Sequence, residues 1–224
     1  MEENRVFTQA ELEEMGKRTR DLIDEAIDKG ELEKAKRLNH RMFAEFLAMH
    51  DLFRDWITGL LSHIHDNYGL EALDDSLKQS LSAWFKPMVE LYEAADFRRK
   101  VNMLAMGLRG HLQPMEVTED DEKVCIRMIP CGSGERLIEE GAYGPPKNFS
   151  TVKGSHALTW GRPECPVYCA HEPVLEILPI EWFGHPEWVV YPQEDRWGGC
   201  SFCVYKRVED IPEEVYRRVG KEKP

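Results

Sequence analysis

The first half of the chain carries an apolar stripe with helical spacing, and this feature limits the choice of fold more than any other. Between residues 31 and 68, large apolar side chains recur every three or four positions, which places them on one side of a helix. This stripe predicts a long amphipathic helix that ends at Gly69, because glycine commonly follows the last helical turn. The stripe consists of Met42, Phe46, Met49, Phe53, Trp56, Leu60 and Ile64.

Two further helices are predicted on either side of this one. Thr8 and Glu11 have the spacing of a capping box, in which each side chain satisfies a free backbone N–H group at the start of a helix. The amphipathic run that follows reaches residue 30. A third helical stretch covers residues 70–108, and Pro87 is expected to kink or divide it because proline lacks the backbone donor.

The composition changes after residue 110, where prolines, glycines and aromatic residues become dense. Alternating apolar and polar side chains in residues 122–130 indicate a strand. Two more strands are predicted at 187–192 and 200–207, joined as a hairpin through 193–199, and a short helix at 211–220.

These elements predict an α+β fold. A helical region, residues 1–110, is expected to pack on a small, mostly antiparallel sheet. The sheet lies in residues 111–224, which also carry a cluster of cysteines and histidines. We expect the two regions to form one compact unit.

The charge and hydropathy of the chain argue against several classes of partner. A formal net charge of −12 argues against nucleic acid, which is bound through clustered Lys and Arg. No apolar run approaches the roughly 20 residues that a membrane helix needs, and the acidic N-terminus lacks the pattern of a secretory signal. We therefore expect a cytoplasmic protein with no membrane or nucleic-acid partner. In a reducing compartment the six cysteines are expected to be free, catalytic or metal-bound rather than paired in disulfides.

Thiols and one histidine in the last third of the chain predict a metal site. If residues 169–171 are extended, Cys169 and His171 point to the same face and can reach one ion. On a continuous strand Cys200 and Cys203 face opposite ways, and we favour Cys200 as the ligand. A glycine-rich turn begins at Cys131 and lets its thiol point inward. Cys131, Cys169, His171 and Cys200 are therefore the predicted ligands, and this donor set suits zinc.

Two other interpretations of the thiols stay open. Free cysteine often behaves as a small buried hydrophobe, and Cys125, in the middle of an apolar strand, is expected to lie in the core. Alternatively, Cys169 or Cys203 is a nucleophile with His171 or His156 as its base.

Aromatic residues crowd around the cysteines and predict a small-molecule pocket. Trp160, Tyr168 and Trp182 are the expected substrate-binding residues, although the same residues could close the core of a small sheet. Glu172 follows the Cys-x-His pair, and His156 lies in a loop-like segment. Both are candidates for catalytic proton transfer. If the segment is helical, Glu172 shares a face with Glu176, and one of the two could be a ligand in place of one of the four.

The order of these features, with the terminal strand sequence GGCSFCVYK at 198–206, resembles the L-2-amino-thiazoline-4-carboxylic acid hydrolase-like family. More distantly, it is similar to the 4-vinyl reductase-type small-molecule-binding domain of aromatic-sensing regulators. The resemblance covers roughly residues 124–206. It implies that Cys200 is the strand cysteine and Cys169 the upstream one, and that a zinc ion lies beside a ligand pocket.

Together, the residues and the resemblance favour a small-molecule hydrolase that acts on a cyclic or amide-like C–N bond with the help of zinc. A zinc ion would lower the pKa of a bound water to about 7 and polarise the substrate. The alternative is a small-molecule-binding, sensor-like module with a structural zinc. Homodimerisation through the long apolar helices is a further expectation, because they carry more apolar surface than a small sheet can cover.

Overall fold

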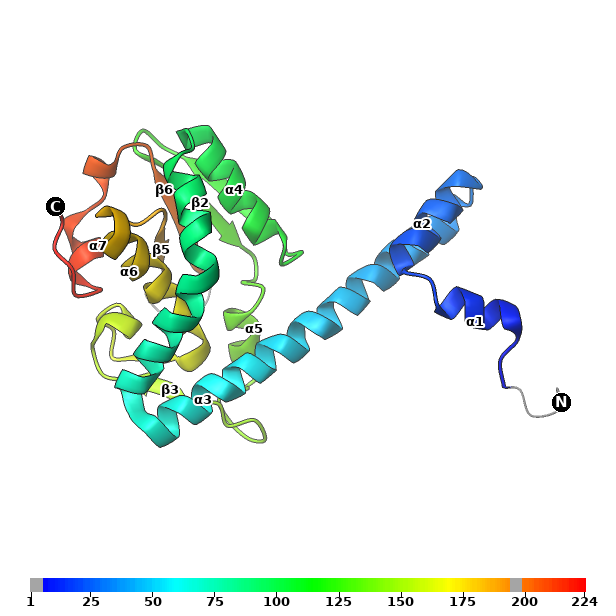
Figure 1. Ribbon diagram of the computed structural model, residues 1–224, viewed down its shortest axis with the longest axis horizontal. Coiled ribbons are helices and arrows are strands. Elements are labelled where there is room, and N and C mark those ends of the chain that lie inside the picture. Colours follow the sequence, from blue (N-terminus) through cyan, green and yellow to red (C-terminus); the bar gives the residue numbers. More distant parts are fainter. Residues whose placement is uncertain (1–5, 194–198) are drawn as a thin grey trace. The chain divides into compact units, whose positions relative to one another are not determined.

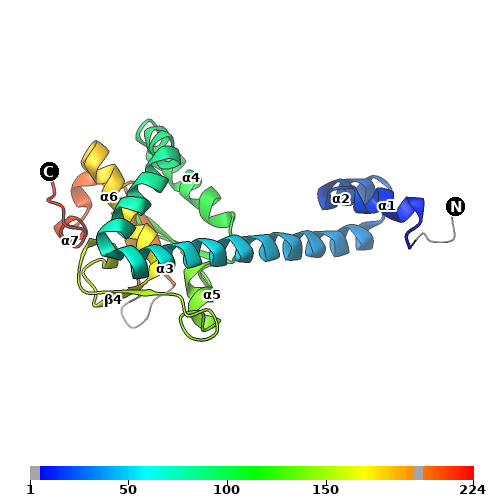
Figure 2. The ribbon, with the colours of Figure 1, turned by 60° about the horizontal axis from the view of Figure 1, so that its bottom comes forward.

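The computed structural model describes residues 6–193 and 199–224 (Figures 1 and 2). These residues fall into two compact units, one that extends to Phe53 and one from Arg54 to Pro224. The second unit holds the sheet together with the helical segments that follow residue 53. The α+β fold predicted from the sequence is confirmed.

The first unit is helical. The capping box at Thr8 and Glu11 is confirmed: Glu11 N–H donates to Thr8 Oγ1 over 3.2 Å, and Thr8 N–H donates to Glu11 Oε2 over 2.7 Å. The run predicted as one helix is two helices with Gly16 at the first C-terminus. The unit contains α1 (Gln9–Met15), α2 (Thr19–Asp28) and the first part of α3 (Leu32–Glu93).

Gly69 divides α3 into two helical segments. Its φ of 86° and ψ of −176° are non-helical and accessible to glycine because it has no Cβ. The helix end predicted there is confirmed. Pro87, by contrast, lies inside α3 without dividing it; the division falls after Glu93. The next helix, α4 (Phe97–Arg109), begins where the Asp96 side chain accepts the Arg99 N–H over 2.8 Å.

The main sheet has four antiparallel strands in the order β1-β2-β6-β5. The three predicted strands are confirmed as β2, β5 and β6. Most of the predicted connection between the last two lies outside the described residues. The strands are β1 (Met115–Glu119), β2 (Lys123–Met128), β5 (Val189–Tyr191) and β6 (Ser201–Tyr205), and a separate antiparallel pair consists of β3 (Thr151–Lys153) and β4 (Glu164–Pro166).

Short helices connect these strands. The predicted C-terminal helix is confirmed as α7. The connecting elements are α5 (Gly134–Glu139), η1 (Ala157–Thr159), η2 (Val167–Ala170), α6 (His171–Phe183), η3 (Val208–Asp210) and α7 (Glu213–Arg217).

One face of the sheet packs on helices and forms the core. Ile126 of β2 lies opposite Phe202 of β6, and both are buried in one cluster with residues of α3, α4 and α6. Phe85 of α3 is fully buried in this cluster, with its ring centroid 6.2 Å from that of Trp182. Trp182 therefore packs on the core, the alternative that the sequence left open for it, and its role in substrate binding stays a prediction.

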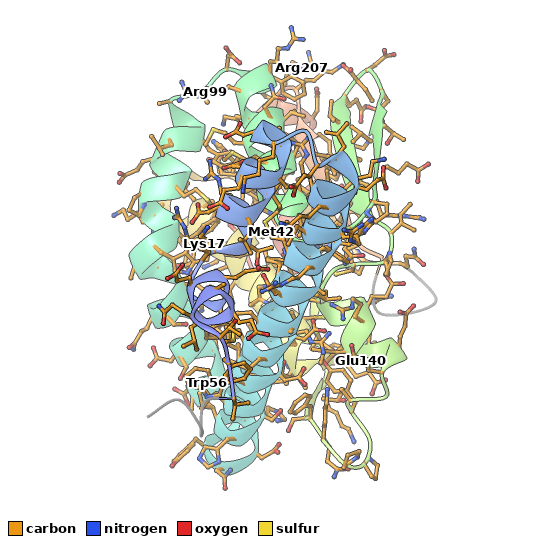
Figure 3. All side chains as sticks on the ribbon, turned by 90° about the vertical axis from the view of Figure 1, so that its right-hand side faces the viewer. Lys17, Met42, Trp56, Arg99, Glu140 and Arg207 are labelled. Carbon is orange, nitrogen blue, oxygen red and sulfur yellow. A yellow bond between two sulfur atoms is a disulfide. The ribbon has the colours of Figure 1, made fainter. Side chains whose placement is uncertain are left out.

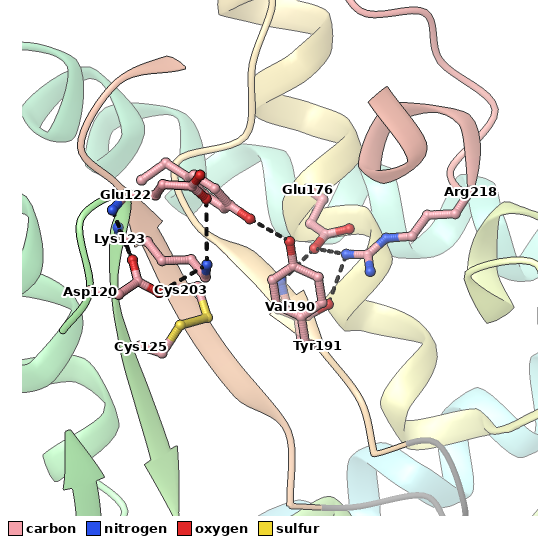
Figure 4. The surroundings of a disulfide bond; sticks show 10 residues. Asp120, Glu122, Lys123, Cys125, Glu176, Val190, Tyr191, Cys203 and Arg218 are labelled. Carbon is pink, nitrogen blue, oxygen red and sulfur yellow. Dashed lines mark hydrogen bonds and ion pairs between the residues drawn. A yellow bond between two sulfur atoms is a disulfide. The ribbon is translucent and has the colours of Figure 1, made fainter. Parts of the chain in front are cut away.

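The other face of the sheet carries a disulfide. Side chains alternate along a strand, so the neighbours of Ile126 and Phe202 point away from the helical core. Cys125 and Cys203 are these neighbours, lie directly opposite each other and are bonded, with a Cα–Cα distance of 4.0 Å (Figure 4). The prediction that Cys125 is a core thiol is wrong, and so is the expectation of six unpaired cysteines.

Part of the predicted apolar stripe stays exposed on α3. Trp56, labelled in Figure 3, is 59% exposed and Leu60 is 50% exposed. The stripe therefore marks a true helix face, but the described part of this chain does not cover it. No helix in residues 6–193 or 199–224 is long and apolar enough to cross a membrane.

Candidate functional site

A small cavity of about 70 Å³ lies where α4, the turn after β2, the start of α6 and the start of β6 meet. All four predicted metal ligands line it: three are cysteines and one is a histidine. Predicted pocket and proton-transfer residues also line it. The predicted residues in its wall are Cys131, Trp160, Tyr168, Cys169, His171, Glu172 and Cys200.

Cys131 is held by the tight turn that leads into α5. Its own N–H donates to the Glu135 carboxylate over 2.8 Å, and the backbone N–H groups of residues 133–135 face its sulfur. A side chain at Gly134 would place a Cβ 2.7 Å from the Cys169 sulfur. Glycine is therefore needed here for the backbone of the turn to approach the second thiol.

Cys169 and His171 reach the cavity from helical rather than extended backbone. Cys169 lies in η2 and His171 begins α6, so the prediction that both share one face of a strand is wrong. The turn between η2 and α6 brings them to the same cavity instead. His171 Nδ1 bonds the Tyr168 carbonyl oxygen, and its Nε2 lies 3.3 Å from Glu172 Oε1.

Cys200 enters the cavity just before β6 begins. Cys203, three residues later, is bonded to Cys125 and has no free thiol. This excludes Cys203 as the nucleophile of the thiol-enzyme alternative. The preference for Cys200 over Cys203 as the available thiol is consistent with this arrangement.

Cys165 is a fourth free thiol that the sequence did not place at the site. It lies in β4, is fully buried, and donates its thiol hydrogen to the Pro166 carbonyl over 3.3 Å. It does not line the cavity, but an ionised Cys165 would raise the pKa of Cys169, and an ionised Cys200 would raise that of Cys165. The four free cysteines of the described chain are therefore neighbours, with three of them in the cavity wall.

The cluster is electrostatically unusual because thiols and carboxyls gather where little water reaches. Burial raises the pKa of Cys131, and raises those of Cys165 and Cys169 far more. The neighbouring thiols and Glu172 add to the rise at Cys169. These thiols are therefore neutral at ordinary pH, which disfavours a thiolate nucleophile, whereas a bound cation would reverse the effect.

Glu172 and His171 form a polar pair at the edge of the cluster. Glu172 Oε2 is buried and makes no hydrogen bond within the described part of the chain. Burial lowers the pKa of His171, but the Glu172 charge and the hydrogen bonds to Glu172 and Tyr168 outweigh it, so its pKa lies above the ordinary value. A buried carboxylate oxygen without a partner is the kind of atom that a cation or a polar ligand would satisfy.

The ligand atoms of the cluster are more widely spaced than a single zinc ion requires. Four thiolates around zinc lie about 3.8 Å apart, given a Zn–S bond of about 2.3 Å in a tetrahedron. Within residues 6–193 and 199–224, no three ligand atoms of this cluster all lie within 4.8 Å of one another. The donor types fit zinc chemistry, but the spacing does not match a closed zinc site.

A second group, which the sequence did not predict, does meet that spacing. Glu93, His185 and Glu187 offer ligand atoms within 4.8 Å of one another and could hold a metal ion. Lys100, however, already lies on the same carboxylates, 3.1 Å from Glu187 Oε2 and 3.5 Å from Glu93 Oε1. Burial, reinforced by Glu93, raises the pKa of Glu187 to about 8. A metal ion would have to displace both this proton and the ammonium group.

A larger, mainly apolar cavity of about 480 Å³ lies beside the cysteine cavity. Its walls come from the two segments of α3 on either side of Gly69, with Leu61 and Leu77 facing it from opposite segments. Tyr168 and His171 line both cavities. The volume falls within the range that small-molecule sites usually occupy.

Two further predicted site residues, His156 and Trp160, lie in different surroundings. His156 caps η1 and lines neither cavity, and the charges of Asp74 and His65 act on it. Its role in proton transfer stays a prediction that neither cavity supports. Trp160 lines the cysteine cavity, and its Nε1 donates to the buried Glu176 carboxylate over 2.9 Å, which fixes the indole ring.

Comparisons with known proteins identify no family for this chain. No protein-family model, curated protein or solved structure matches the chain.

Proposed function

We propose that this protein binds a small, largely apolar molecule in the cavity between the two segments of α3, next to an inorganic centre at the cysteine cavity. The observation that carries the proposal is that Tyr168 and His171 line both cavities. A molecule in the larger cavity would therefore contact the residues that border the thiols. Apolar walls with a few polar groups at one end are typical of sites for small organic ligands.

The residues around the thiols support an inorganic centre. Thiolates and imidazole are ligands of zinc, the metal predicted from the sequence, and four cysteines also suit iron–sulfur clusters. Glu172 Oε2, buried and without a hydrogen bond in the described residues, is an additional oxygen donor. When bound, a zinc ion with an open coordination position would supply Lewis acidity at the end of the apolar cavity, whereas an iron–sulfur cluster would supply a redox centre.

Hydrolysis of a C–N bond is a second candidate function, favoured by the contact between His171 and Glu172. His171 Nε2 lies 3.3 Å from Glu172 Oε1 at the wall that the cavities share. In such a reaction Glu172 would accept a proton from the attacking water, and His171 would donate one to the leaving nitrogen. The cysteines would hold the centre rather than attack the substrate.

Ligand binding tests the first proposal directly. We would titrate the protein with a panel of small aromatic compounds and follow Trp84 and the other tryptophans by fluorescence, since Trp84 lines the larger cavity. Ile57→Arg places a charge in that cavity and is expected to abolish binding. Leu91→Arg is the matched control, because Leu91 is an exposed residue of α3 outside the cavity wall. Equal binding by both variants would refute the proposal.

The hydrolytic candidate needs a separate measurement. Glu172→Gln removes the proton acceptor but keeps its size, so it is expected to abolish turnover of cyclic amide-like substrates while leaving ligand affinity within a few fold. If no member of a substrate panel is hydrolysed by the wild type, the protein is a binding module.

A further inference from the structure

We infer that the cysteine cavity is built for an iron–sulfur cluster held by Cys131, Cys165, Cys169 and Cys200. The inference rests on the proposed function, because it identifies the inorganic centre beside the ligand cavity. Cys131, Cys169 and Cys200 line the cavity, and Cys165 lies next to them behind the wall as the fourth thiol. The inference adds Cys165 to the ligand set and replaces a single zinc ion with a polynuclear group.

The arrangement of the six cysteines is the first argument. Cys125 and Cys203 are joined on the outer face of the sheet. The other four are free and come from separate places: the turn after β2, strand β4, η2, and the residue before β6. Four cysteine thiolates are the usual ligand set of both [2Fe–2S] and [4Fe–4S] clusters.

The spacing of the sulfurs is the second argument. A lone tetrahedral zinc draws all of its sulfurs to about 3.8 Å from one another. In the described chain no three ligand atoms here come within 4.8 Å of one another, yet three of the cysteines line a single cavity of about 70 Å³. In an iron–sulfur cluster the cysteines bind different iron atoms, so their sulfurs are held further apart around a volume that the cluster fills.

The surroundings of the sulfurs are the third argument. Backbone N–H groups of residues 133–135 face Cys131, and the absence of a side chain at Gly134 lets the same turn touch Cys169. N–H groups directed at cysteine sulfur stabilise the negative charge of a cluster and tune its potential. Trp160, Met128 and Phe202 contribute apolar surface to the cavity wall and would limit access of water.

Metal and sulfide analysis tests the inference. The full chain would be expressed with added iron and cysteine, purified without a metal-affinity tag under anaerobic conditions, and assayed for iron, zinc and acid-labile sulfide. We expect iron and sulfide in equal amounts, about two to four of each per chain, and a visible absorption band that bleaches with dithionite. About one zinc per chain without sulfide, or no bound metal, would overturn the inference.

Cysteine variants identify the ligands. Cys131→Ala, Cys165→Ala, Cys169→Ala and Cys200→Ala are each expected to lose most of the iron and sulfide. The double variant Cys125→Ala/Cys203→Ala is the matched control and is expected to keep both. If a ligand variant does not fold, the wild-type apoprotein is reconstituted with iron and sulfide, or with zinc alone. Uptake of zinc without any cluster formation contradicts the inference.

The two proposals fail in different ways. Cluster content measured on Ile57→Arg should equal that of the wild type, because the substitution lies in the apolar cavity. A protein that carries the cluster but binds no apolar compound refutes the ligand site alone. A protein that binds apolar compounds but carries no cluster refutes the cluster alone.

Discussion

The ion pair between Glu176 and Arg218 allows a sharp test of how burial acts on charged groups in this protein. The Glu176 side chain is completely buried in α6, and Arg218 Nη2 donates to its Oε1 over 2.6 Å (Figure 4). Two other donors, Val190 N–H and Trp160 Nε1, complete the shell at 2.7 and 2.9 Å. Replacing Arg218 with methionine keeps the apolar stem but leaves a buried carboxylate without its cation. Removing one partner of a buried pair typically costs about 3–5 kcal/mol.

The loss of unfolding free energy in Arg218→Met should grow as the pH rises. Burial raises the pKa of Glu176 to about 7, although Arg218 pulls it down. Because this folded pKa lies above the unfolded value, the folded state holds a proton that the unfolded state has lost. Stability therefore falls as pH rises from about 4.5 to 7, by about 1.4 kcal/mol per unit. In Arg218→Met the Glu176 pKa rises further, so the substitution should cost about 3–5 kcal/mol at about pH 8.5 but only about 1–2 kcal/mol at about pH 5.5.

Urea unfolding at both pH values, followed by circular dichroism, gives these free energies. Arg207→Met is the control, because the Arg207 side chain is 72% exposed in its pair with Asp210 and should contribute less than about 1 kcal/mol. Glu176→Gln combined with Arg218→Met should cost less than the sum of the single changes. If Arg218→Met costs the same at both pH values, Glu176 does not titrate in the folded protein and the reasoning is refuted.

Three shorter predictions follow from other contacts. Arg54→Met should lower the unfolding free energy in urea by about 1.5–3 kcal/mol, the range for hydrogen bonds to charged groups. The buried guanidinium bonds Glu140 over 2.7 Å and Asp55 over 2.9 Å, but both carboxylates are partly exposed and keep Lys147 as a partner (Figure 3 labels Glu140). A loss as small as that of an exposed pair would contradict this prediction. Gly69→Ala should lower the unfolding free energy by about 1–3 kcal/mol through backbone strain alone, because nothing lies within 4 Å of the added carbon. An unchanged unfolding free energy would show that the turn relaxes freely. Gly134→Ala should reduce the amount of bound metal while preserving the far-ultraviolet circular dichroism, because its Cβ would lie 2.7 Å from the Cys169 sulfur. Full metal content would mean that the turn at Gly134 and the segment at Cys169 move apart without loss of the site.

The secondary structure was largely predictable because its signals are local. The apolar stripe, the Thr8–Glu11 cap and the alternation in β2 each depend on residues within one or two turns or strand repeats. Pro87 misled because a long helix with tertiary support can accommodate a proline that an isolated helix would not. The stripe predicted a helix face but not which of its residues, such as Trp56, stay exposed.

The candidate site was predictable in its chemistry but not in its membership. Residue type pointed to Cys131, Cys169 and Cys200, which line one cavity, although the extended backbone assumed for Cys169 is helical. The disulfide was missed because it depends on the register between β2 and β6, which no local pattern encodes. Cys165 was not assigned from the sequence, because its approach to the other thiols depends on how β4 packs.

The group of Glu93, His185 and Glu187 left no spacing signal at all, because its members come from segments about ninety residues apart along the chain. Trp160 and Trp182 are equally apolar in sequence, and only the packing of α6 against Phe85 sends one to a cavity wall and the other to the core. Composition alone could not separate them.

The break at Gly69 has a consequence for the order in which the two cavities form during synthesis. Leu61 and Leu77, on opposite sides of the break, are sixteen residues apart, so two walls of the apolar cavity can meet once this short stretch has left the ribosome. The four free thiols come together only after Cys200 has been made. A nascent chain can therefore shape most of its apolar cavity early, whereas its set of four free thiols is complete only after Cys200 has been made.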